Sequence, residues 1–313
     1  MTAQSPQTIY LKDYTPFGYL VDSVHLTFKL HPTKTRVISR IAFRPNPDTK
    51  NREFFLHGEQ LTLIRASVDG QDWKPHVTDE GLTAQVPDAP FIWESEVEIS
   101  PSTNTALEGL YMSNGMYCTQ CEAEGFRKIT YYPDRPDVMS VFTVSIEGDE
   151  PVLLSNGNPQ TSGTGFAEWH DPWPKPAYLF ALVAGDLIAH PDHFTTMTGK
   201  HVALNIYVRP GDEGKCAFGM EALKKSMTWD EEVYGREYDL DIFNIVAVDD
   251  FNMGAMENKG LNIFNSSCVL ASPETSTDFN FERIEAIIAH EYFHNWTGNR
   301  ITCRDWFQLC LKE

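Results

Sequence analysis

The stretch from residue 290 to residue 313, HEYFHNWTGNRITCRDWFQLCLKE, constrains this chain more than any other. It opens with HEYFH, in which His290 and His294 stand four residues apart. Because residues four apart share one face of a helix, this spacing predicts a helix that presents both imidazoles to a single point. Two neutral imidazoles placed in this way suit a zinc ion, which in catalytic sites has three protein ligands and one open position.

Two acids extend this arrangement. Glu291 follows the first histidine, so we expect it beside the metal, where a carboxylate can take a proton from a metal-bound water. Thr302 and Asp305 are expected to begin a second helix, DWFQLCLKE, which could fold back beside the first. Glu313, separated from His294 by eighteen residues, could then supply the third ligand. The alternative, an amphipathic helix with two unrelated histidines, stays open on the pentapeptide alone.

The residues around the histidines predict how their helix begins, packs and ends. Asp278 or Asn280 is expected to cap its first turn. The body, FERIEAIIAH, is apolar around much of its circumference, which predicts a buried helix whose polar groups need partners. Gly298 and Asn299 are expected to end it.

This stretch resembles the zinc-site signature of the gluzincin aminopeptidases of the bacterial aminopeptidase N type. That family has H-E-x-x-H, then eighteen residues, then Glu. The resemblance implies that His290, His294 and Glu313 bind one zinc ion per chain. It also implies that Glu291 is the general base.

A second informative stretch is the loop of residues 251–260, FNMGAMENKG. Gly254 would let another backbone approach, and the segment could form an exposed sheet edge to which an extended peptide adds. A simple turn is the other interpretation of such a loop. Residues 254–258, GAMEN, match the exopeptidase motif of the same family. The resemblance implies that Glu257 binds the free α-amino group of the substrate. It also implies that Gly254, Ala255, Met256 and Asn258 bind the substrate.

A third match is CTQCEAEGFRKITYYPDRPD, residues 118–137. The resemblance implies that Glu122 reaches the active site and shares the substrate's ammonium, with Gln120 as a neighbouring pocket residue. Met253 is expected to wall the pocket for the first side chain, and simple core packing is the alternative. The C-x-x-C of Cys118 and Cys121 lacks a second pair, so we expect it to be structural or incidental.

Hydrophobic periodicity predicts an α+β chain of two domains. Residues 1–186 alternate apolar and polar side chains between turn signals, which indicates an all-β antiparallel sandwich or saddle. Residues 187–313 predict the front part of a thermolysin-like catalytic domain, incomplete at its C-terminal end. The expected elements there are strands at 201–208, 242–248 and 260–265 and a helix at 217–234.

Composition limits the partners. The formal net charge of −19 argues against nucleic acid and against an anionic membrane surface. Residues 1–14 show no secretory signal, and no apolar segment is long enough to span a membrane. The six scattered cysteines indicate reduced thiols, so we expect a cytoplasmic protein. We also expect a monomer.

These expectations converge on a zinc-dependent aminopeptidase that releases N-terminal residues from peptides by attack of a zinc-bound water. One alternative is a different hydrolase on the same scaffold, such as an endopeptidase. Another is a catalytically incompetent fragment, because a tyrosine and a helical domain of the family would follow Glu313. We therefore expect residues 1–313 alone to bind zinc poorly and to be inactive.

Overall fold

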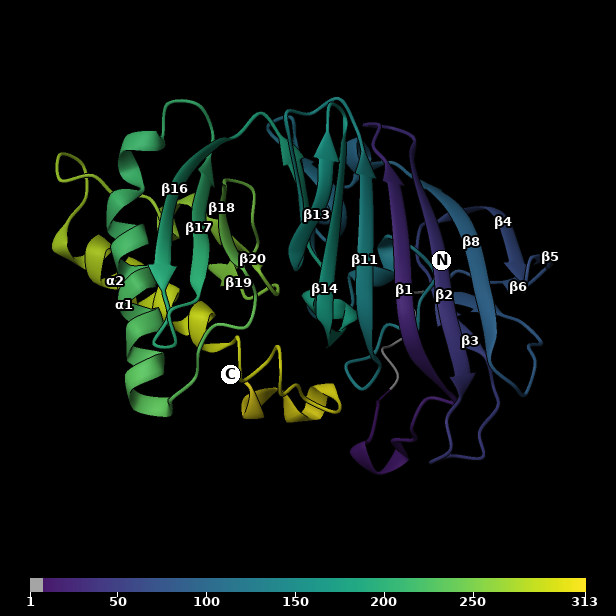
Figure 1. Cartoon of the computed structure of the whole chain (residues 1–313). Coiled ribbons are helices and arrows are strands. Elements are labelled where there is room, and N and C mark those ends of the chain that lie inside the picture. Colours follow the sequence, from purple (N-terminus) through teal and green to yellow (C-terminus); the bar gives the residue numbers. More distant parts are fainter. Residues whose placement is uncertain (1–7) are drawn as a thin grey trace.

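The computed structural model describes residues 8–313 (Figure 1). Within this range, strands dominate as far as residue 185, and both α-helices come later. This is the predicted order of an all-β part followed by an α+β part. The expectation about a secretory signal concerns in part residues 1–7, which lie outside the described residues. None of the described helices has the length and apolar character needed to cross a membrane.

The first part of the described chain contains three sheets. The largest has eight strands in the order β13-β14-β11-β1-β2-β8-β4-β5, a second has the order β12-β15-β10-β9, and a third has the order β3-β7-β6. The strands of the largest sheet are β1 (Tyr19–Lys29), β2 (Thr35–Pro45), β4 (Thr62–Val68), β5 (Gln71–Asp72), β8 (Phe91–Ile99), β11 (Met139–Glu147), β13 (Asn158–Gly163) and β14 (Phe166–Pro176). The other strands are β3 (Phe55–His57), β6 (His76–Val77), β7 (Gly81–Thr83), β9 (Gly109–Ser113), β10 (Met116–Gln120), β12 (Val152–Ser155) and β15 (Leu182–Gly185).

The core of the first part lies between the eight-stranded sheet and the four-stranded sheet. Val24, Leu26 and Phe28 alternate with more exposed residues along β1, so one face of the large sheet is buried. Phe28 stacks on Phe180, just before β15, with 5.8 Å between ring centroids. Every residue of β10 and β15 is buried, so the four-stranded sheet is covered on both faces.

Two predicted turn signals form tight hairpins. Asn114-Gly115 joins β9 to β10, and Asp69-Gly70 joins β4 to β5. All four residues have positive φ angles, between 49° and 85°, as a type I′ turn requires. One ladder differs from the antiparallel expectation, because β1 pairs in parallel with β11 from Ser23↔Val141 to Lys29↔Glu147.

The second part is built on a five-stranded sheet of order β16-β17-β18-β20-β19. Its strands are β16 (Ile188–Thr195), β17 (His201–Val208), β18 (Ile242–Val248), β19 (Ala255–Met256) and β20 (Leu261–Asn265). Helix α1 (Ala217–Tyr234) connects the parallel strands β17 and β18 and ends at Gly235, whose φ of 61° is left-handed. These elements lie where the sequence predicted them.

The five-stranded sheet is buried on both faces. Val246 and Val248 of β18 and Ile263 of β20 belong to the core of the first part. Ile245 and Phe264 belong instead to a second core, which includes residues of α1 and of helix α2 (Asp278–Phe293). The two parts of the chain are therefore joined by a continuous apolar contact.

Helix α2 differs from its prediction in its cap and its burial. Thr277 is the N-cap, in a capping box completed by Asn280, so the prediction of Asp278 or Asn280 as the cap was wrong. The helix buries one face through Ile284, Ile288 and Tyr292, whereas Phe279 is 70% exposed. The expectation of a helix buried all round was also wrong, because only one side packs on α1 and the sheet.

The segment after α2 differs too. The helix ends at Phe293, before the predicted stop at Gly298. The expected second helix is instead a 3-10 helix, η7 (Trp306–Leu311), with Asp305 as its N-cap accepting a hydrogen bond from the Phe307 amide. Such a short segment gains few helical hydrogen bonds for the cost of nucleation, so tertiary contacts decide its form.

Candidate metal and substrate site

The last turn of α2 brings the two histidines together. Their Nε2 atoms lie 3.0 Å apart, and their ring planes are at 89° to each other. His294 is buried, whereas the His290 side chain is 51% exposed. Burial, followed by the neighbouring His294, lowers the pKa of His290, which favours the neutral imidazole that a metal needs.

The orientation of His294 is set by its own backbone turn. Its Nδ1 lies 2.7 Å from the Thr297 carbonyl oxygen, which can only accept, so Nδ1 carries the proton and Nε2 is left as a free acceptor. Gly298 makes this turn possible. Its φ is +134°, and a Cβ there would lie 3.2 Å from Nδ1 of His294.

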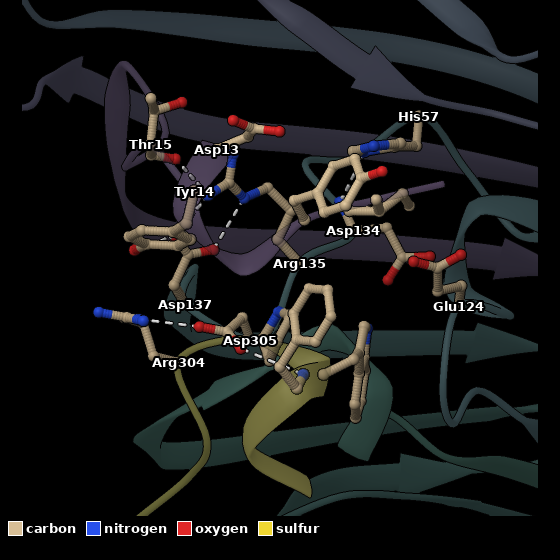
Figure 2. Close-up of a pocket in the computed structure, with 15 residues that line it drawn as sticks. Asp13, Tyr14, Thr15, His57, Glu124, Asp134, Arg135, Asp137, Arg304 and Asp305 are labelled. Carbon is tan, nitrogen blue, oxygen red and sulfur yellow. Dashed lines mark hydrogen bonds and ion pairs between the residues drawn. The ribbon is translucent and has the colours of Figure 1, made fainter. Parts of the chain in front are cut away.

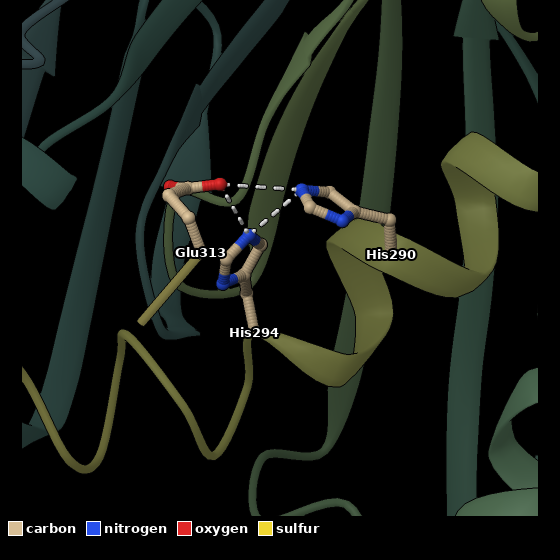
Figure 3. A group of neighbouring side chains, drawn as sticks. All are labelled: His290, His294 and Glu313. Carbon is tan, nitrogen blue, oxygen red and sulfur yellow. Dashed lines mark hydrogen bonds and ion pairs between the residues drawn. The ribbon is translucent and has the colours of Figure 1, made fainter. Parts of the chain in front are cut away.

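Glu313 reaches the same point from the end of η7 (Figure 3). Its Oε2 lies 3.5 Å from Nε2 of His290 and 3.6 Å from Nε2 of His294. A tetrahedral zinc site with bonds of about 2.0–2.2 Å separates its donor atoms by roughly 3.3–3.6 Å. The two separations that involve Glu313 lie in this range, and the 3.0 Å between the two imidazole nitrogens is slightly shorter. The donor set of two imidazoles and a carboxylate therefore fits zinc after a small widening.

Glu291 lines the same pocket as the three donor residues. It is 6% exposed. Burial, with the added charges of Glu257, Glu313 and Glu122, raises the pKa of Glu291 to about 9. A carboxylate so poorly solvated is a strong proton acceptor once a cation beside it holds it ionised.

Two further acids face the donors, and a lysine bridges them. Nζ of Lys312 lies 2.9 Å from Oε1 of Glu122, 2.8 Å from Oε1 of Glu257 and 2.6 Å from Oε1 of Glu313. Burial would lower the pKa of Lys312, but the carboxylates outweigh it and the pKa is raised. Burial and the charge of Glu257 raise the pKa of Glu122, against the opposing effect of Lys312.

The GAMEN segment forms the edge of the five-stranded sheet. Strand β19 pairs with β20 on one side only, as expected for an edge that could accept a peptide. Met253, Gly254 and Ala255 line the pocket with Glu257. Met256 and Asn258, also predicted as substrate-binding residues, do not line it and are 1% and 0% exposed.

Gln120 also lies apart from the pocket lining. It is buried, and its side-chain Nε2 donates to the Glu122 carbonyl oxygen at 3.3 Å. It thus contacts the loop that carries Glu122. Cys118 and Cys121 are both buried and unpaired.

Sequence reasoning missed a network behind the site. Nζ of Lys259 donates to Oδ1 of Asn295 at 2.6 Å and pairs with Asp239, which also pairs with Arg300. In addition, Nδ2 of Asn299 donates to the Glu257 carbonyl oxygen at 3.0 Å. The loop that carries Glu257 is therefore tied to the turn that follows His294. The only sequence signal was the cluster of polar residues around each motif.

Another hollow lies between the N-terminal segment and the start of η7 (Figure 2). Both arginines that line it are paired with acids of the same lining. Arg135 pairs with Asp137 at 2.7 Å, and Arg304 pairs with Asp305 at 2.9 Å. None of the predicted ligand or substrate residues lines it.

Comparison with known families agrees with this fold and arrangement. Residues 21–179 match the Peptidase M1 N-terminal domain, and residues 218–313 match the Peptidase family M1 domain. The chain therefore belongs to peptidase family M1, and the resemblance inferred from its motifs is confirmed.

Within this family, the chain is similar to aminopeptidase N. It is 58% identical to aminopeptidase N of Caulobacter vibrioides over 100% of this chain and 51% identical to that of Escherichia coli over 99% of it. A crystal structure of Legionella pneumophila aminopeptidase A in complex with aspartic acid matches with a TM-score of 0.91 and 36% identity over 97% of this chain. This match confirms the predicted fold class. The chain spans 37% of the length of each of these three proteins.

Proposed function

We propose that the protein containing this chain is a zinc-dependent aminopeptidase that removes N-terminal residues from peptides. One observation carries the proposal: three metal-type donor atoms lie 3.0–3.6 Å apart in the same pocket as the acids Glu122 and Glu257. A metal site supports hydrolysis, and paired acids beside it suit a substrate that ends in an ammonium.

In this proposal His290, His294 and Glu313 hold the zinc ion. Zinc, when bound, would lower the pKa of a water molecule and polarise the peptide carbonyl. Glu291 takes the proton of the attacking water and passes it to the leaving amine. Its burial supports this role, because a poorly solvated carboxylate binds a proton more readily than an exposed one.

Glu257 and Glu122 would bind the α-ammonium of the first residue and so set the cleavage position. Gly254 and Ala255 would present the sheet edge to the substrate backbone, and Met253, 49% exposed, would contact the first side chain. An endopeptidase on the same scaffold is the second candidate. The two acids speak against it, because an internal peptide bond offers no ammonium to pair with them.

The experiment compares cleavage of an alanyl chromogenic substrate with cleavage of its N-acetylated form by the complete gene product. We expect the free amine to be cleaved and the acetylated form to be ignored. Glu257→Ala should raise KM for the free amine with zinc content unchanged, since removing one partner of a desolvated charge pair costs about 2–5 kcal/mol. Efficient cleavage of the acetylated substrate by the wild-type protein would favour the endopeptidase.

We also retain the proposal that residues 1–313 by themselves are inactive. Support comes from Glu313, whose side chain is 39% exposed and follows a short 3-10 helix. The test is to measure zinc content and alanine release of residues 1–313 beside those of the complete gene product. Equal values for both proteins would contradict the proposal.

A cytoplasmic location and a monomeric state are further proposals, and we propose no nucleic-acid or membrane partner. The six cysteines are all unpaired, and five of them are buried, as in a protein kept in a reducing compartment. The net charge of −19 opposes binding to polyanions. Fractionation of cells and light scattering of the purified protein test these points.

A further inference from the structure

Lys312 is enclosed by carboxylates from three separate segments of the chain. Glu122 lies in the loop after β10, Glu257 directly follows β19, and Glu313 is the neighbour of Lys312 itself. The ammonium contacts one oxygen of each acid, always Oε1, at 2.6–2.9 Å. A single cation thus joins the two proposed ammonium-binding acids to a proposed metal ligand.

The lysine approaches these acids from the protein side. Its side chain is 1% exposed, and it does not line the pocket, whereas all three acids do. Its Nζ lies 5.2 Å from the centre of the Tyr178 ring, which packs below it. The Tyr178 hydroxyl in turn donates to the Gly298 carbonyl oxygen at 3.3 Å. Lys312 is therefore also supported by Tyr178, which does not line the pocket.

This arrangement leaves the second oxygen of each acid free of the lysine. For Glu313 the structure shows where that oxygen goes, because Oε2 faces both histidines at 3.5 and 3.6 Å. For Glu122 and Glu257, two buried negative charges so close together would repel each other without a cation between them. Lys312 offsets that repulsion and fixes the acids at a common distance from one point.

We propose that Lys312 is a positioning residue that sets the selectivity for an α-ammonium, by holding Glu122 and Glu257 together with their free oxygens toward the pocket. The inference rests on the proposed function and deepens it. A substrate ammonium adds to the pocket side of a carboxylate pair that the lysine has already arranged. Glu122 and Glu257 then require no rearrangement when the substrate binds.

The test measures a discrimination ratio in the complete gene product. The inhibition constants of alaninamide and N-acetylalaninamide are determined against an alanyl chromogenic substrate, and zinc content is measured in parallel. Lys312→Met should lower the preference for the free amine by about tenfold or more, with KM rising more than kcat falls. Loss of stability alone would weaken both inhibitors alike and leave the ratio unchanged.

Lys175→Met is the matched control. Lys175 is an equally buried lysine, with a side chain that is 1% exposed, but its ammonium pairs with Asp171 at 3.1 Å and with neither of the two acids. It should lower stability and keep the wild-type ratio. We call Lys312 and the three carboxylates around it, Glu122, Glu257 and Glu313, the acid cage. Lys312→Gln keeps hydrogen-bond donors in this cage without the charge. It should lower the ratio as Lys312→Met does even if the methionine variant folds poorly.

Four outcomes decide the matter. A wild-type ratio in both Lys312 variants would overturn the positioning role, and so would an equal loss of the ratio in Lys175→Met. A wild-type protein that binds the acetylated ligand as well as the free amine would overturn the proposed function itself, and this role with it. The fall of the ratio in the Lys312 variants alone is the expected result.

Discussion

Burial decides what Glu291 can do in the pocket. The side chain is 6% exposed and stands between the histidines in sequence and near three other acids in space. Glu291→Gln should therefore keep the proposed zinc ion and lose turnover by about a hundred- to ten-thousand-fold, because only the base is removed. Metal analysis and kcat measure the two effects separately.

Glu285→Gln is the control for this variant. Glu285 lies on the same helix, is about half exposed and pairs with Lys225 at 3.5 Å. It should retain both zinc and activity. If Glu291→Gln lost zinc together with activity, Glu291 would be a ligand and the proposed base would have to be sought elsewhere.

His57, which lies outside the site, should make the free energy of unfolding depend on pH. Burial, followed by the charge of Arg127, lowers its pKa to about 4, and its Nδ1 accepts a hydrogen bond from the Asp134 amide at 3.2 Å. The folded state thus binds fewer protons than the unfolded state between pH 4 and 6.5, the ordinary pKa of histidine. The free energy of unfolding should then fall as pH drops through this window, by up to about 3 kcal/mol.

The measurement is denaturant unfolding of wild type and His57→Asn between pH 4 and 7. Asp134, whose pKa burial raises to about 6, acts with the opposite sign, so the difference between the two proteins is the quantity to compare. A difference that stays constant across this range would show that His57 is not kept neutral by the fold.

At the residue scale, spacing predicted His290, His294 and Glu313, and the structure brings their donor atoms together. Lys312 could not be predicted, although it adjoins Glu313. Its burial comes from contacts with residues far away in sequence, such as Glu122 and Tyr178, and no local pattern records them. Met256 and Asn258 were predicted to bind substrate but are buried away from the pocket. A sequence motif marks all of its residues alike, whereas the fold buries some of them and exposes others.

Among the elements, α1, β17 and β18 were predicted with the bounds that the structure shows, because each has a clear apolar period. The 3-10 helix η7 was predicted as an α-helix. Its apolar residues Phe307 and Leu311 are 53% and 73% exposed, whereas Trp306 packs on Tyr178, so the segment has no continuous buried face that would select the α form. Periodicity was informative where a face is buried and misleading where it is not.

Two glycines of the site, Gly298 and Gly254, differ in how well their positions would accept a side chain. A Cβ at Gly298 would meet His294, and its φ of +134° disfavours any other residue. Gly298→Ala should cost about 1–3 kcal/mol of stability and weaken zinc binding by turning His294. Thermal unfolding and zinc titration measure these effects.

Gly254→Ala is the comparison variant. A Cβ there would lie 3.8 Å from Sγ of Cys268, an ordinary contact. Its stability should change by less than about 0.5 kcal/mol. KM should rise, since the methyl group would narrow the approach to the sheet edge. A loss of stability equal to that of Gly298→Ala would show that Gly254 serves the fold and not the substrate.

Considered as a whole, the molecule is held together across its two parts by core residues. The sequence indicated where the pattern changes, near residue 186, but not that β18 and β20 complete the core of the first part. Alternation along a strand shows that a face is buried and does not identify its partner. Tyr111 adds a polar contact across the same boundary, with its hydroxyl donating to the Asp250 carbonyl oxygen at 2.8 Å.

This shared core predicts the behaviour of residues 1–186 expressed alone. Without Val246, Val248 and Ile263, the core of the first part would lose the apolar side chains that β18 and β20 contribute to it. The segment should bind a hydrophobic dye and unfold at a lower temperature than residues 1–313. A cooperative, monomeric segment that binds no dye would show that the first part needs nothing from the second.

The acid cage has a consequence for biosynthesis. Its members are residues 122, 257, 312 and 313, so the ribosome makes the first of them long before the last. At about 5–20 residues per second, roughly 10–40 s separate the synthesis of Glu122 from that of Glu313. Throughout that interval a nascent chain has neither its proposed third metal donor nor the cation that gathers its acids. Under the proposed function, peptide cleavage would thus be withheld from the growing chain by the order of its residues.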